Sequence, residues 1–143
     1  MIKKTFLTRG IVLLMAMSLL PLAWSPTFAA EAKLVKIQPV GEEKLVGFYL
    51  DPPILQIEKN TIVVWLSGVK GNDIQVVFME GKTCRDVTAN PGAFKLDDKS
   101  CYVTSFMGFG ETSSLQFMES GTYSYYVATD TGNIKAKGTI VVR

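Results

Sequence analysis

Short runs of apolar and β-branched residues, each ended by a turn signal, recur along the chain from residue 33 to its end. The run TIVVWLS (61–67) shows no alternation, which is typical of a central strand buried on both faces. No stretch keeps a helical period of 3.6 residues over three turns. The pattern therefore predicts an all-β fold: a Greek-key β-sandwich of seven to eight short strands.

The first 29 residues do not share this pattern. They begin with Lys3, Lys4 and Arg9, continue with an apolar run over residues 11–22, and end in the small-residue segment SPTFAA. This order is typical of a secretory signal peptide. An uncleaved anchor is the alternative, but the run is shorter than the roughly 20 residues that a bilayer span needs. We expect cleavage after Ala29 or Ala30, a domain over residues 30–143, and a periplasmic or secreted protein without a membrane span.

The charge balance argues against nucleic-acid binding. The formal net charge of the whole chain is +2. Three of its cations lie in the predicted signal peptide, so the predicted domain is close to neutral. Nucleic-acid binding needs clustered Lys and Arg, and no such cluster remains after cleavage.

A polar stretch from Gly81 to Ser100 breaks the strand rhythm and contains the turn signal Asn90-Pro91-Gly92. Cys84 and Cys101 bracket it. Cysteine pairs in exported proteins usually oxidise, so a Cys84–Cys101 disulfide is expected. Such a bond would close a ring of about 18 residues and stabilise the fold by roughly 3 kcal/mol. The alternative is a Cu(I) site made by these thiols with Met79, Met107 or Met118, because soft sulfur ligands suit that ion.

Three segments resemble the cupredoxins. FYLDPPILQIEKNTIVVWLSG (48–68) is similar to the region of their second and third strands, with Asn60 at the tight turn. ESGTYSYYV (119–127) resembles their run Gly-Thr-Tyr-x-Tyr-x-Cys, and KGTIVV (137–142) resembles their closing strand. The resemblance extends from about residue 34 to residue 143. It implies a sandwich of cupredoxin type, in agreement with the strand pattern.

Cupredoxins hold one copper ion through two His, one Cys and a weak axial Met. The resemblance places these four positions at Ile74 (or its neighbour Asp73), Val127, Asp130 and Lys135. The chain has no histidine at any position. A blue-copper centre needs imidazole and thiolate ligands. The resemblance therefore implies a cupredoxin-like domain that lacks the copper ligands, and no cofactor is expected.

Other catalytic patterns are weak. A Ser–His pair is excluded by the absence of histidine, and the acidic residues Asp86, Asp97 and Asp98 match no calcium-loop spacing. We therefore do not expect an enzyme. The alternative to a non-catalytic module is an electron-transfer or copper-handling protein that uses a non-standard Cys/Met site.

The segment TSFMGFGET (104–112) is the most suggestive non-metal feature. Phe106, Met107 and Phe109 lie next to Gly108 and Gly110, a composition that favours a loop. In cupredoxins, an apolar patch at the metal end of the sandwich docks redox partners, and the hypothesis is that this loop lies at the same end. We expect the three apolar side chains to form a binding surface for a protein of the cell envelope. The alternative is that one of the phenylalanines caps the core.

Overall fold

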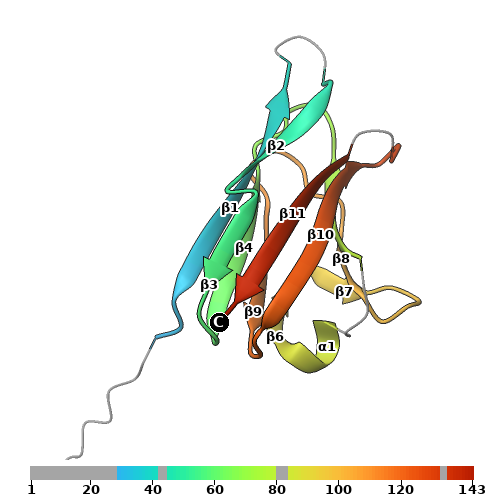
Figure 1. The fold of residues 1–143 in the computed structure, drawn as a ribbon. Helices are drawn as coiled ribbons and strands as arrows, with labels where there is room; N and C mark the ends of the chain where they lie inside the picture. The colour runs from blue at the N-terminus through green and yellow to red at the C-terminus, as the bar shows by residue number, and fades with distance from the viewer. Residues whose placement is uncertain (1–28, 42–44, 80–83, 133–134) are drawn as a thin grey trace, which may run out of the picture.

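Two β-sheets pack face to face in the computed structural model (Figure 1), which describes residues 29–41, 45–79, 84–132 and 135–143. Sheet A has the order β2 (Gly47–Asp51), β1 (Ala32–Val40), β4 (Thr61–Ser67), β9 (Thr112–Phe117), β6 (Thr88–Gly92). Sheet B has the order β3 (Ile54–Ile57), β11 (Lys135–Val142), β10 (Gly121–Thr129), β5 (Ile74–Phe78), β8 (Tyr102–Thr104), β7 (Phe94–Leu96). The predicted signal peptide lies outside the described residues, apart from Ala29.

The all-β sandwich is confirmed, but the expected number of strands is wrong. The described part of the chain has eleven strands and one four-residue helix, α1 (Cys84–Val87). Two of the additional strands, β6 and β7, lie in the stretch that was expected to be a loop. Their sequences, TANPG and FKL, carry no strand signal of their own. They are extended because they pair with strands already in place, β6 with β9 and β7 with β8.

Long-range pairings tie the two ends of the chain into the sandwich. β1 runs parallel to β4, and β3 runs parallel to β11.

The chain passes from sheet A to sheet B between β2 and β3, through a cis peptide bond before Pro52. Among the later crossings between the sheets, the one from β6 to β7 joins the edge strands at the other side of the sandwich. Both lateral sides of the sandwich are therefore spanned by a chain crossing.

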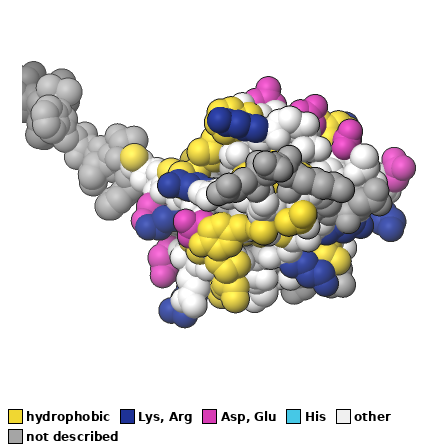
Figure 2. All heavy atoms as spheres, turned by 90° about the horizontal axis from the view of Figure 1, so that it is seen from above, with side chains coloured by type: hydrophobic (Ala, Val, Ile, Leu, Met, Phe, Trp, Pro, Cys, Tyr) yellow, Lys and Arg dark blue, Asp and Glu magenta, His cyan; other side chains and the backbone are white. Residues whose placement is uncertain are grey.

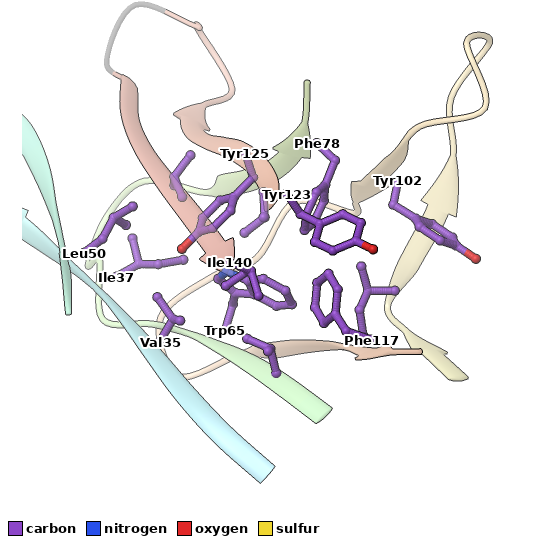
Figure 3. Packing of buried hydrophobic residues seen from close by; sticks show 14 of the residues in the cluster. Val35, Ile37, Leu50, Trp65, Phe78, Tyr102, Phe117, Tyr123, Tyr125 and Ile140 are labelled. Atoms are coloured by element: carbon purple, nitrogen blue, oxygen red, sulfur yellow. The ribbon is translucent and has the colours of Figure 1, made fainter. Parts of the chain in front are cut away.

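Trp65 lies at the centre of the core, fully buried between the sheets as expected (Figure 3). Its ring meets the rings of Phe78, Phe94 and Tyr125 edge to face, with centroids 5.5–5.8 Å apart. Such pairs add about 0.5–1.5 kcal/mol each beyond the burial of apolar area.

The expectation that strand 61–67 is buried on both faces is wrong. Its inward residues, including Val63 and Trp65, are buried, but the outward residues Ile62, Val64 and Leu66 are only half-buried. A two-layer sandwich covers only one face of each sheet. The uninterrupted apolar run is therefore not evidence that a further layer covers the outer face of this strand.

The tight turn between β3 and β4 depends on Asn60, whose φ is +73°. Asparagine tolerates this left-handed conformation better than most residues. The side-chain amide of Gln116 donates to the Asn60 backbone oxygen (3.1 Å) and to its Oδ1 (2.7 Å). Gln116 Oε1 accepts from Asn90 Nδ2 at 2.6 Å. One buried glutamine thereby joins the turn, β9 and β6.

Candidate functional site

The four positions where copper ligands were expected gather at one end of sheet B. Ile74 begins β5 and pairs with Thr129 at the end of β10, and Val127 pairs with Val76 on one side and Ala136 on the other. Lys135 begins β11 and pairs with Ala128. Asp130 follows β10 directly, and its backbone N–H donates to the backbone carbonyl oxygen of Asp73 at 3.3 Å. The four positions therefore lie close together, and their correspondence to copper ligands stays a prediction.

The side chains at these positions do not fit a copper ion. Ile74 and Val127 are completely buried hydrocarbon in the core. Asp130 is exposed, and its Oδ1 accepts from the Thr131 backbone N–H at 2.7 Å. Lys135 is exposed as well, with Nζ 5.2 Å from the centroid of the Tyr126 ring. Two hydrocarbons, a solvated carboxylate and an ammonium offer none of the imidazole and thiolate donors that hold copper in both redox states.

No alternative metal cluster is seen among the described residues, where no three His, Cys, Asp or Glu side chains come together. Asp97 instead orders the β7–β8 hairpin, because its Oδ1 accepts from the backbone N–H groups of Lys99 (2.8 Å) and Cys101 (2.9 Å). Asp86 is exposed at α1.

Cys84 begins α1, and Cys101 lies in the β7–β8 hairpin, directly before β8. Cys101 is a buried free thiol, and burial, followed by the nearby Asp97 carboxylate, raises its pKa. The side chain of Cys84 lies outside the part of the structure that is described. Cys101 is not part of a disulfide in this structure, so the Cys84–Cys101 bond expected for the exported protein stays a prediction.

A loop with two exposed aromatic rings covers the same end of the sandwich. We call residues 105–111 the aromatic loop. Phe106 is 48% exposed and Phe109 is 60% exposed. These values exclude the alternative that either phenylalanine caps the core.

Hydrogen bonds fix the aromatic loop to β4 of sheet A, and the bridge between Met107 and Ile74 fixes it to β5 of sheet B. Gly108 N donates to Glu111 Oε2 at 2.8 Å, and Gly110, with φ +81°, donates to the Ser67 oxygen at 2.7 Å. The backbone N–H of Ser67 in turn donates to the backbone carbonyl oxygen of Glu111 at 2.9 Å. The rings of Phe106 and Phe109 are thus presented on an ordered backbone.

Met107 differs from the expectation, because it does not share the exposure of its neighbours. Only 2% of its surface is accessible, and its backbone exchanges two hydrogen bonds with Ile74 (3.0 and 2.7 Å). The bridge to β5 turns this side chain inward and leaves those on either side outward. Met107 therefore anchors the aromatic loop and cannot line its surface. Met79 and Met118 are exposed.

Lys70 extends this surface and was not found from the sequence. Its Nζ lies 5.0 Å from the centroid of the Phe109 ring, a cation–π contact. Lys70 also lines an open depression of about 430 Å³, together with Pro39, Gly41, Leu45, Gly68, Gly71 and Asn72. Figure 2 looks down on this end of the sandwich and shows hydrophobic side chains gathered among scattered charged ones. No sequence signal pairs Lys70 with a residue 39 positions away.

Comparison with solved structures finds amicyanins, which are cupredoxins. The reduced Cu(I) form at pH 4 of one amicyanin mutant is 20% identical with a TM-score of 0.47, covering 82% of this chain and 87% of that chain. Another reduced mutant is 19% identical with a TM-score of 0.48 and the same coverage. An oxidised mutant is 19% identical with a TM-score of 0.47, covering 78% and 82%. No family model matches the chain, and no curated protein sequence matches it.

Proposed function

We propose that this chain is an exported, non-catalytic binding module of the cell envelope that works without copper and docks a protein partner through the aromatic loop. The observation that carries this proposal is the pair of exposed rings, Phe106 and Phe109, on a hydrogen-bonded loop. At the same end of the sandwich, hydrocarbon side chains occupy two of the positions where copper ligands were expected. Exposed aromatic side chains on ordered backbone are favourable docking groups, because little side-chain entropy is lost when they are covered.

Several features of this end support docking rather than chemistry. Ile74 and Val127 have no group that can donate or accept a proton or bind a metal. Phe109 lies under the Lys70 ammonium, so the surface combines an apolar centre with a polar rim. Independently of this end, no helix in the described part of the chain is long and apolar enough to cross a bilayer.

Site-specific photo-crosslinking in the cell envelope tests the proposal. The photoreactive residue p-benzoylphenylalanine replaces Phe109 in one variant and Ile54 in a matched control. Ile54 is 61% exposed, almost the same as Phe109, but lies on the edge strand β3. We expect a discrete protein adduct from position 109, none from position 54, and loss of the adduct when Phe106→Ser is added. Identical adducts from both positions, or none from position 109, would refute docking through the loop.

A further inference from the structure

A row of five side chains crosses the outer face of sheet B, one from each of five adjacent strands. In register, Lys137 (β11) is opposite Tyr126 (β10), Tyr126 is opposite Val77 (β5), Val77 is opposite Val103 (β8), and Val103 is opposite Lys95 (β7). The two lysines are exposed and the three central side chains are half-buried. We call this set the lysine-bounded row.

The charge of this face has one sign. The six strands of sheet B contain three lysines, Lys95, Lys135 and Lys137, and no Asp or Glu. The Lys135 ammonium lies over the Tyr126 ring, and Lys137 is directly opposite Tyr126 on β11, so two lysines adjoin this ring. The neighbouring carboxylates, such as Asp73 and Asp130, lie beyond the ends of the strands. A positive face with an apolar centre is therefore built into the sheet.

A depression of about 230 Å³ adjoins the row at Lys137. Its lining includes the side chains of Ser124 and Thr139 and the exposed Met79. Ser124, Thr139 and Lys137 thus supply two hydroxyl groups and an ammonium to its lining, and such donors suit a carboxylate.

The charge pattern selects the occupant of this face. A second copy packed sheet B to sheet B would bring lysines against lysines, which costs binding energy. A lipid surface would need apolar side chains that project into the bilayer, whereas Val77 and Val103 are half-buried in the sheet. An acidic protein surface with an apolar centre satisfies both the lysines and the central row.

We propose that the outer face of sheet B, centred on the lysine-bounded row, is a second docking surface and binds an acidic polypeptide. It lies on different residues from the aromatic loop. The two surfaces can therefore be tested separately, and one can fail while the other holds.

The test measures binding of the purified chain to a random copolymer of glutamate and tyrosine by fluorescence anisotropy at two salt concentrations. The test variant is Lys95→Glu with Lys137→Glu. The matched control is Lys36→Glu with Lys59→Glu, which makes the same change in net charge on exposed lysines outside sheet B. We expect the test variant to weaken binding by about tenfold and the control by less than about twofold. Added salt should weaken binding of the unmodified chain, because it screens exposed charges.

Three outcomes would overturn the proposal. Equal loss in both variants would mean that only net charge matters. No binding of the unmodified chain to the copolymer would exclude an acidic polypeptide. Binding to phosphatidylglycerol vesicles without binding to the copolymer would assign the face to lipid. Far-UV circular dichroism checks that the variants are folded, and Phe106→Ser with Phe109→Ser should leave copolymer binding unchanged.

Discussion

Gly138→Ala should destabilise the sandwich, although alanine is usually better than glycine in a strand. Gly138 faces the core directly opposite Tyr125, whose ring lies over it. A methyl group at position 138 would overlap Cζ and Oη of that ring and lie 2.7 Å from Cε1. The ring has little room to move, because the rings of Trp65 and Phe78 each lie 5.6 Å from it, centroid to centroid.

The expected loss in free energy of unfolding is the difference between two opposing effects. Overpacking a filled core costs about 1–3 kcal/mol. Replacing a strand glycine by alanine returns about 0.5–1 kcal/mol. Because Tyr125 is held between two rings, we expect a cost near the top of the range and a net loss of about 2 kcal/mol. For a domain of this size, that loss corresponds to a fall in Tm of roughly 8 °C.

Urea denaturation followed by circular dichroism measures this loss. Gly47→Ala is the matched control, because Gly47 also lies in a strand but its nearest neighbour would be Val40 Cβ at 3.9 Å. That variant should be as stable as the unmodified chain or slightly more stable. Adding Tyr125→Leu to Gly138→Ala should cost less than the sum of the two single changes, because the smaller side chain leaves room for the methyl group. Unchanged stability of Gly138→Ala would show that the Tyr125 ring does not lie over position 138.

Four further predictions combine the sequence with the structure. Gln116→Leu should cost about 1–3 kcal/mol in urea denaturation, because it leaves polar groups of Asn60 and Asn90 without their partner, whereas Gln56→Leu on the exposed side of β3 should cost little. Burial raises the pKa of the Tyr125 phenol, and the Trp65 indole lowers it by less. The folded state therefore keeps the phenol proton above pH 10, where the unfolded chain loses it, so the free energy of unfolding should fall as the pH rises further. An ultraviolet titration should show one phenol that ionises late, and Tyr125→Phe should remove it. Mapping of non-reduced peptides should find Cys84 bonded to Cys101, and two free thiols in freshly exported protein would contradict this. The combined variant Ile74→His, Val127→Cys and Asp130→His should gain copper affinity and visible absorption, and a folded variant that binds no copper would show that the ligand register is misplaced.

Much of the fold could be predicted because alternation and turn signals are local. Residues 61–67, 74–79 and 122–128 each carry enough β-branched and aromatic residues to define a strand without their neighbours. Residues 88–92 and 94–96 do not, since their extended conformation comes from pairing with β9 and β8. The number of layers was also inaccessible from the pattern, because half-buried Ile62, Val64 and Leu66 read the same as fully buried residues.

Only part of the candidate site could be predicted from the sequence. Ile74, Val127 and Asp130 lie together at one end of sheet B, but their correspondence to copper-ligand positions stays a prediction that rests on the resemblance of the Gly-Thr-Tyr run and the closing strand. The inward turn of Met107 could not be predicted, since it depends on a two-bond bridge to Ile74 that no local pattern indicates. The contact of Lys70 with Phe109 and the row from Lys137 to Lys95 each join strands or loops distant in sequence, so they appear only once the sheets are assembled.

The most direct test of a binding module without copper is a titration of the purified chain with Cu(II), followed by visible absorption and metal analysis after desalting. We expect no intense visible band and no stoichiometric copper, because Ile74 and Val127 have no donor atom and Asp130 and Lys135 cannot form a copper–thiolate bond. One copper retained per chain with an intense blue colour would contradict the account.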